Sequence, residues 1–419
     1  MKPNAFPTRE IRRALLAAAI ACATSAGASE TATLVSPAPS AGAEMAFAAS
    51  VDGTEIAIGA PGENAIAGAI YVTDCAALPC TTPLRIAPDD VAAGDAFGTA
   101  VGLSGDTLIA SAPGSEPGVV YVYARNGSGW SEQARLTPSG GAAGERFGVA
   151  ASLSGDRIAV GADPATHDAG AVYVFARNGT AWSQEARLAP GGAAQIDAFG
   201  SSVALDGDTL LAGAPLRAGV SVGSYARGAV YVFTRAGASW TPQATLTAAA
   251  SANGDLFGTS LALAGDRAAI GAPYAASAQG TAYVFARTGS AWTQHAELNA
   301  SDGAAGDEFG WSVALGEDKV IVGAPYKGQL ADAPCGGAYV FDAELAETSE
   351  GAIDAPLVDD LAGWAVAASG SRWIATAPGH VVEDAEHAGA AYWFDGEAII
   401  FRSGFDLPGA CTAEEGPDV

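Results

Sequence analysis

Acidic side chains recur at one position along the chain, and carboxylates in such a pattern are candidates for metal chemistry. Calcium takes carboxylate and carbonyl oxygens as ligands, so the acid-rich loops around Asp95, Asp302 and Asp307 are candidates for a calcium site. The alternative is that each carboxylate accepts backbone N–H groups within its own loop, as Asp does in turns. Recurrence favours this structural role, because a single site would not need the same residue in every repeat. An acid stands two residues before a Phe-Gly pair or its degenerate equivalent at Asp95, Glu145, Asp197, Asp255, Asp307 and Asp360.

A second candidate metal site lies in the segment 379–389, which contains His380, Asp384 and His387. Imidazole and carboxylate groups can bind transition metals. Their spacing matches no known metal motif, so the sequence favours an ordinary loop, and we expect no required cofactor. A G-x-S-x-G elbow, an H-E-x-x-H pair and a phosphate-binding glycine loop are all missing from the sequence, which argues against the corresponding hydrolases and nucleotide enzymes.

The first residues have the pattern of an export signal. A basic segment precedes an apolar run that is too short to span a bilayer, and small residues follow at Ala26-Gly27-Ala28. This order predicts a signal peptide over residues 1–28. A lipoprotein signal that ends at Cys22 is the competing reading. Either route places the mature chain outside the cytoplasm, at the surface, in the periplasm or in the medium, without a transmembrane segment.

In an oxidising compartment the remaining four cysteines form an even set. Cys75 and Cys80 are five residues apart and predict a clip across one hairpin. Cys335 and Cys411 pair by elimination. The formal net charge of the whole chain is −26. Removal of residues 1–28 takes away more basic than acidic residues, so the mature chain is still more negative. We therefore expect no binding to nucleic acid or to an anionic membrane, since both need clustered Lys and Arg.

The candidate residues lie within a sequence repeat that recurs along most of the chain. A Gly-Ala-Pro tripeptide or a close variant recurs at intervals of 50 to 58 residues. It begins at Gly59, Ser111, Gly161, Gly213, Gly271, Gly323 and Thr376. A Phe-Gly pair stands upstream, degenerate in the two outermost copies at Met45-Ala46 and Ala362-Gly363. Seven copies are thus present.

Each copy predicts four short antiparallel strands, because apolar residues alternate between turn signals. In one copy the strands are FGSSVAL, TLLAGAP, GAVYVFTR and WTPQATLTA, with a tight turn at Asp206-Gly207. Such units, repeated about every 50 residues, are typical of propeller blades. The tryptophans that open the fourth strand are predicted to be structural: Trp130, Trp182, Trp240 and Trp292.

The ring must also close, and two segments compete for the outer strand of the last blade. Residues 31–37 resemble other fourth strands, although no blade precedes them. Residues 397–401, after a turn at Asp395-Gly396, are the alternative. We favour the N-terminal segment, which joins the two ends of the chain without an exposed edge. The predicted organisation is a signal peptide over 1–28, an all-β, seven-bladed propeller over 29–402 and a tail over 403–419.

Phe-Gly followed by Gly-Ala-Pro resembles the FG-GAP repeat of the integrin α-chain propeller and of related bacterial exported proteins. The resemblance covers residues 31 to about 402 and implies loops on one face that recognise a protein or a glycan. It does not extend to the family's calcium loops. The turns here, such as Ser104-Gly105-Asp106, are too short to supply six oxygen ligands.

The connections between second and third strands lie on the same face as the connections between blades. The irregular segments of the chain are found among the connections on this face. Variable loops on a rigid scaffold are where binding sites usually lie. The candidate binding residues are Arg217, Tyr225, Arg227, Tyr274, Tyr326 and Lys327. We therefore predict a monomeric, non-enzymatic recognition or adhesion propeller with an extracellular protein or glycan partner. A loop-face enzyme acting on an extracellular polymer and a calcium-stiffened structural protein of the cell surface are the alternatives.

Overall fold

A computed structural model describes residues 32–127, 129–140, 144–162, 170–189, 197–217, 226–250, 252–328, 334–351, 359–382, 385 and 387–395. Regular structure in these residues is almost entirely β, in seven antiparallel sheets of four strands. The described residues include two single helical turns, α2 (Glu63–Ile66) and α3 (Ala275–Ala278). None of the described helices has the length and hydrophobicity needed to cross a bilayer.

The sheets follow one another along the chain as blades 1 to 7. Blade 1 contains β2 (Ala48–Asp52), β3 (Glu55–Ala60), β4 (Ala69–Asp74) and β5 (Leu84–Ile86). Blade 2 contains β6 (Val101–Ser104), β7 (Thr107–Ala112), β8 (Val119–Asn126) and β9 (Gly129–Leu136). Blade 3 contains β10 (Phe147–Ser154), β11 (Arg157–Ala162), β12 (Ala171–Asn178) and β13 (Ala181–Leu188). Blade 4 contains β14 (Val203–Asp206), β15 (Thr209–Ala214), β16 (Ala229–Ala236) and β17 (Ser239–Leu246).

The remaining blades keep the same order. Blade 5 contains β18 (Leu261–Ala264), β19 (Arg267–Ala272), β20 (Thr281–Thr288) and β21 (Ala291–Leu298). Blade 6 contains β22 (Ser312–Leu315), β23 (Val320–Ala324), β24 (Gly337–Phe341) and β25 (Glu347–Gly351). Blade 7 contains β26 (Val366–Ser369), β27 (Arg372–Ala377), β28 (Ala390–Phe394) and the N-terminal strand β1 (Ala32–Val35).

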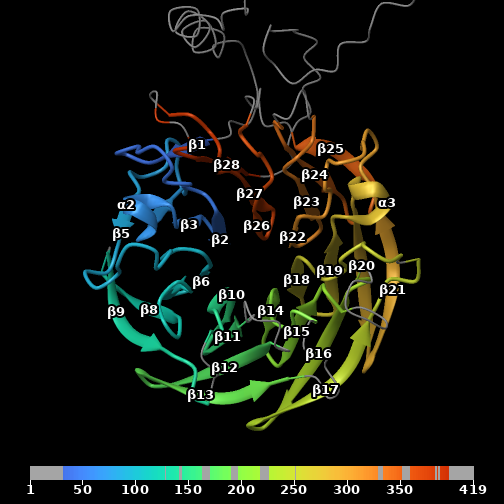
Figure 1. Ribbon diagram of the computed structural model, residues 1–419, viewed down its shortest axis with the longest axis horizontal. Coiled ribbons are helices and arrows are strands. Elements are labelled where there is room, and N and C mark those ends of the chain that lie inside the picture. Colours follow the sequence, from blue (N-terminus) through green and yellow to red (C-terminus); the bar gives the residue numbers. More distant parts are fainter. Residues whose placement is uncertain are drawn as a thin grey trace, which may run out of the picture. The chain divides into compact units, whose positions relative to one another are not determined.

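The first strand of every blade is the innermost (Figure 1). Each of these strands contacts the first strand of the next blade, and β26 contacts β2, so the ring closes. The second strand of a blade has both faces covered, and all six residues of β15 are buried. The outer strands face solvent on one side, and burial along β13 varies from exposed to buried. Because burial decreases from the inner to the outer strands of a blade, the second strands before Gly-Ala-Pro are apolar runs, whereas the fourth strands contain both polar and apolar residues. The predicted all-β, seven-bladed architecture is confirmed.

The N-terminal segment closes the ring. β1 pairs antiparallel with β28, with Ala32 opposite Trp393 and Val35 opposite Ala390. The last blade thereby gains its fourth strand from the other end of the chain, which confirms the preferred closure. Residues 397–401 lie outside the described residues, as do 1–28 and 403–419. The signal peptide and the tail stay predictions.

Close packing between blades explains the repeated tripeptide. A Cβ added at Gly271 would lie 2.9 Å from the carbonyl carbon of Gly310, the Phe-Gly glycine of the next blade, and closer still to its oxygen. The same oxygen accepts a hydrogen bond from Ser260 Oγ at 2.8 Å. Gly59, Gly161 and Gly323 face the carbonyl groups of Gly98, Gly200 and Gly363 in the same way. The Gly of Gly-Ala-Pro and the Gly of Phe-Gly are therefore two sides of one contact.

The phenylalanine of Phe-Gly fills the core of its own blade. Phe97, Phe147, Phe199, Phe257 and Phe309 are fully buried. Each meets a tyrosine of the third strand edge to face; for Phe97 and Tyr121 the ring centroids are 5.2 Å apart and the planes lie at 90°. Such aromatic pairs contribute about 0.5–1.5 kcal/mol beyond the area that they bury. Their recurrence helps to make the blades equivalent.

The repeated tryptophans link neighbouring blades on the fourth strands. Trp182 Nε1 donates to Gln133 Oε1 of the preceding blade at 2.8 Å, and Trp240 Nε1 donates to Glu185 Oε2 at 2.9 Å. Arg177 lies over the Trp182 ring at 5.4 Å. These contacts support the predicted structural role. Trp240 is buried, whereas the other three are half-buried.

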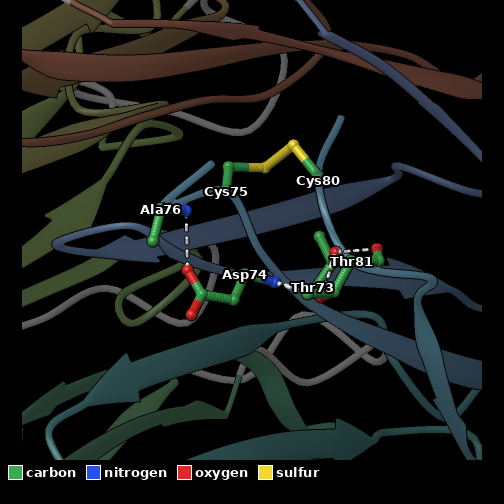
Figure 2. The surroundings of a disulfide bond; sticks show 6 residues. All are labelled: Thr73, Asp74, Cys75, Ala76, Cys80 and Thr81. Atoms are coloured by element: carbon green, nitrogen blue, oxygen red, sulfur yellow. Dashed lines mark hydrogen bonds between the residues drawn. A yellow bond between two sulfur atoms is a disulfide. The ribbon is translucent and has the colours of Figure 1, made fainter. Parts of the chain in front are cut away.

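The predicted clip of Cys75 and Cys80 is present as a disulfide in the connection from β4 to β5 (Figure 2). Hydrogen bonds hold the same connection: Asp74 N donates to Thr81 Oγ1 at 2.9 Å, and Ala76 N donates to Asp74 Oδ1 at 2.8 Å. Cys335 is buried. Its predicted partner Cys411 lies outside the described residues, so that pairing stays a prediction.

Candidate functional site

The connections between second and third strands and those between blades lie on one face of the propeller, here called the loop face. In blade 1 the two kinds of connection are hydrogen-bonded, because Gly94 N and Ala96 N both donate to Ile66 O, at 3.2 and 2.7 Å. The opposite face holds the tight turns between first and second strands. There Asp106 pairs with Arg125 at 2.8 Å.

Three of the six repeated carboxylates before Phe-Gly accept backbone hydrogen bonds within their own loops. Asp95, Asp255 and Asp307 each accept the N–H of the residue three positions earlier, at 2.7, 2.5 and 2.8 Å. Glu145 instead accepts from the Tyr173 hydroxyl at 2.6 Å. The three aspartates have the geometry that the structural interpretation predicts, whereas Glu145 bonds to a side chain of β12. Calcium binding by these residues stays a prediction.

The other proposed metal ligands are also engaged with protein groups. Asp302 accepts from the Tyr339 hydroxyl at 2.7 Å and pairs with Lys327 at 2.8 Å. Burial raises the pKa of Asp302, but the bonds from Lys327 and Tyr339 outweigh burial and leave the pKa below its usual range. His380 Nδ1 lies 3.0 Å from Asp360 Oδ2.

The histidine segment is described only in part. His387 O accepts from Glu44 N at 3.0 Å, and Asp384 lies outside the described residues. Within the described ranges, no group of three His, Cys, Asp or Glu side chains is arranged to hold a metal ion. Metal binding at this segment stays a prediction.

The predicted binding residues fall into two sets. Arg217 is 4.0 Å from Asp197 and lies over the Tyr231 ring at 5.2 Å. Arg227 Nε donates to Asn253 Oδ1 at 3.0 Å. Both arginines are thus engaged beside blade 4, where Tyr225 lies outside the described residues. Tyr274, Tyr326 and Lys327 lie further round the ring, in blades 5 and 6.

Tyr326 belongs to a contiguous group of rings, which we name the axial aromatic cluster: Phe47, Trp311, Tyr326 and Trp364. Trp311 and Trp364 have centroids 5.0 Å apart, Phe47 and Trp364 are 5.4 Å apart, and Trp311 and Tyr326 are 5.9 Å apart. All four side chains are half-buried. The rings are tilted or edge-on to each other, with interplanar angles from 48° to 83°, so they do not stack face on face.

Backbone position places this cluster at the loop-face end of the innermost strands. Phe47, Trp311 and Trp364 each directly follow the Phe-Gly site, just before β2, β22 and β26. Those three strands are adjacent in the closed ring. The other blades carry small or aliphatic residues there: Thr99, Val149, Ser201 and Thr259.

Sequence reasoning missed three of the four rings of the cluster. The signal was available, because Phe47, Trp311 and Trp364 are aromatic departures at one repeat position. Their meeting is visible only once blades 7 and 1 are known to be neighbours. The prediction instead selected Tyr274 and Tyr326, which lie in connections on the loop face.

Seven four-stranded blades closed by the first strand make this protein a seven-bladed β-propeller. The FG-GAP repeat family matches residues 84–123, 130–175, 182–233, 240–285 and 292–341, which together make up more than half of the chain. The chain therefore belongs to the FG-GAP repeat family. Each matched segment runs from the fourth strand of one blade to the third strand of the next, so the sequence repeat is offset from the blade by one strand.

Among solved structures, the hydrazine synthase of Kuenenia stuttgartiensis shares the fold, with a TM-score of 0.52 and 12% identity over 82% of this chain and 94% of that one. This likeness shows the fold alone. A comparison with curated proteins found no match.

Proposed function

We propose that this protein is an exported recognition propeller that binds an extracellular ligand at the axial aromatic cluster, without transforming it. The observation that carries the proposal is the cluster itself. Three adjacent blades place aromatic side chains where the other four place Thr, Val or Ser. Aromatic side chains are enriched at binding surfaces because they contribute large contact areas with few rotatable bonds.

Packing alone does not account for these rings. In blades 2 to 5 the same backbone position is filled by a small or aliphatic side chain while the blade is otherwise complete. The fold therefore has no general need for an aromatic residue there. A function confined to blades 6, 7 and 1 explains the departure.

Export is supported by the N-terminal residue pattern and by the Cys75–Cys80 disulfide, because disulfides persist mainly in oxidising compartments. The name of the structural neighbour is that of an enzyme, but at 12% identity its chemistry does not transfer to this chain. Loops that vary on a uniform scaffold favour recognition as the function of the loop face.

The experiment is a protein and glycan array probed with the mature chain and with two substituted forms. Trp311→Thr and Trp364→Ser each introduce a residue that another blade carries at the same position, so both variants are expected to fold. Val149→Thr, at the equivalent position in blade 3, is the control. We expect ligand binding to fall at least tenfold in the tryptophan variants and to be unchanged in the control.

Two results would contradict the proposal. One is a ligand whose binding is insensitive to both tryptophan substitutions. The other is turnover of the bound ligand by the wild-type chain, which would favour the enzyme alternative.

A further inference from the structure

A glutamate beside the axial aromatic cluster occupies an unusual backbone position. Glu308 has a φ of 56°, in the left-handed region that side chains other than glycine adopt rarely. The same position in other blades holds Ala96, Ala198, Leu256 and Leu361, at φ of 53° to 56°. Blade 3 has Arg146 there, and blade 1 also has a glutamate, Glu44 at φ 48°, but the Glu44 side chain is exposed whereas that of Glu308 is half-buried.

That carboxylate is desolvated and incompletely bonded. Glu308 Oε2 is buried and has no hydrogen-bond partner among the described residues. Burial raises the pKa of Glu308, and a hydrogen bond from Tyr274 opposes the rise only in part. A buried carboxylate oxygen without a hydrogen-bond partner destabilises the folded state. Such an atom in a native protein calls for an explanation.

Nearby cations do not supply the missing partner. Lys327 follows Tyr326 in sequence, but its ammonium group is 2.8 Å from Asp302 and 4.9 Å from the centre of the Tyr339 ring. Within the described residues no ion pair joins Glu308 to a Lys, Arg or His side chain. The adjacent Asp307 is bonded to Ala304 N, so Glu308 is the acid left to bind a ligand.

Two tyrosines lie close to this acid, and the ring of Trp311 packs against one of them, Tyr326. Tyr274 and Tyr326 both interact electrostatically with Glu308, and Trp311 N donates to Glu308 O at 3.1 Å. The Trp311 and Tyr326 planes lie at 83° to each other, so the two rings form a corner. Ring faces attract cations that lie within about 6 Å of the ring centre.

We propose that Glu308 and the rings of Tyr274, Tyr326 and Trp311 form a site for an alkylammonium group of the ligand. The proposal rests on the proposed recognition function and names its ligand chemistry. Tyr274 is 41% exposed, so this side of the site faces solvent. The negative charge of the chain, −26 in total, attracts such a ligand from a distance.

Other ligand chemistries fit less well. A guanidinium group is best matched by two oxygens of one carboxylate, and Tyr274 already bonds to this carboxylate. A neutral sugar stacks on a flat exposed ring, whereas Trp311, Tyr326 and Trp364 are half-buried and mutually tilted. An anionic ligand would be repelled by the Glu308 carboxylate, which forms no ion pair within the described residues. A compact cation satisfies both the oxygen and the ring faces.

The test is a titration of tryptophan fluorescence and of NMR chemical shifts of the full mature chain with small probes. Choline, n-butylammonium and guanidinium are the cations. 3,3-Dimethyl-1-butanol has the shape of choline without its charge. We expect saturable binding of at least one alkylammonium probe, and binding of the neutral probe that is at least tenfold weaker. Preference for n-butylammonium would indicate a lysine side chain as the source, and preference for choline would indicate a quaternary amine.

Matched variants separate this site from a non-specific charge effect. Glu308→Gln and Glu308→Ala should each weaken alkylammonium binding roughly 10- to 100-fold, the range for loss of a charge-assisted hydrogen bond. Ala occupies the equivalent position in blades 2 and 4, so Glu308→Ala is expected to fold. Glu317→Gln, an exposed acid in the first turn of the same blade, is the control and should bind like wild type.

Three results would overturn the proposal: no saturable binding of any alkylammonium probe, equal binding of the neutral probe, or equal losses in the Glu308 and Glu317 variants. These outcomes are distinct from failure of the recognition function. An array ligand that is lost in Trp364→Ser but retained in Glu308→Gln would leave recognition standing and exclude the ammonium site. A ligand insensitive to every one of these substitutions would remove both.

Discussion

Substitution of Gly271 by alanine tests whether contact between blades dictates the repeated tripeptide. The added Cβ would lie 2.9 Å from the Gly310 carbonyl carbon and closer to its oxygen, and that oxygen is backbone that cannot rotate away. The clash between the added Cβ and the Gly310 carbonyl group can be relieved only if blades 5 and 6 separate locally. The separation also lengthens the 2.8 Å hydrogen bond from Ser260 Oγ to Gly310 O.

The cost has two parts. Overpacking of a close-packed interior costs about 1–3 kcal/mol, and a weakened hydrogen bond adds about 1 kcal/mol. The free energy of unfolding should therefore fall by about 2–4 kcal/mol. Since unfolding entropy scales with chain length, each kcal/mol corresponds to roughly 1–2 °C in a chain of this size. The expected fall in Tm is therefore about 2–8 °C, measured by scanning calorimetry.

Gly129→Ala is the matched control. Gly129 has no positive φ, and the nearest atom to an added Cβ is Asn126 O at 3.9 Å. Alanine there should leave Tm unchanged or raise it slightly, because it restricts the unfolded chain. Equal Tm values for the two variants would refute the interblade explanation. Ser111→Gly, which restores the common tripeptide in blade 2, should not destabilise the protein by the same mechanism.

Three further predictions concern charge, covalent linkage and closure. Burial raises the pKa of Glu185, but hydrogen bonds from Arg235 and Trp240 lower it by more, so the net pKa is below its usual value. The stabilisation that ionised Glu185 gives the folded state is therefore fully present above the unfolded-state pKa. It is lost as the pH falls through the lower folded-state pKa. Glu185→Gln should destabilise at pH 7 by about 2–3 kcal/mol, and the difference from wild type should shrink below about pH 4 in denaturant titrations; a pH-independent difference would count against the charge pairing. Reduction of Cys75–Cys80, or serine at both positions, should cost about 2 kcal/mol because the closed loop is short; an unaltered denaturation midpoint would contradict this. Deletion through β1 (Ala32–Val35) should expose the β28 edge and produce concentration-dependent association by light scattering, whereas a stable monomer of normal Tm would show that β1 is dispensable.

The sequence was sufficient for the architecture because the same physical demands recur in every blade. The glycine at Gly271 and the buried phenylalanine at Phe309 are each required by a contact that is repeated around the ring. Repetition makes such a contact visible as a periodic residue. The short disulfide was equally accessible, since Cys75 and Cys80 are local in the chain. The N-terminal closure could be favoured, but its register with β28 could not be read from the sequence.

The candidate site could be predicted only in part. Tyr274 and Tyr326 could be selected because they lie in connections on the loop face, whereas Phe47 and Trp364 lie more than 300 residues apart in the sequence. No local pattern links two such residues. Their rings meet at 5.4 Å because closure of the ring makes blades 7 and 1 neighbours.

The periodic residues of the chain by themselves determined the number of blades, the four-stranded unit and the membership of a repeat family, since each blade satisfies the same local packing rules. Tertiary structure alone decided which non-repeating side chains come together and which charges lack a partner. Glu308 illustrates the difference: its identity is written in the chain, but its burial, its left-handed backbone and its unsatisfied oxygen arise from the blades that surround it. Contacts between distant residues depend on closure of the ring, and no single repeat contains that information.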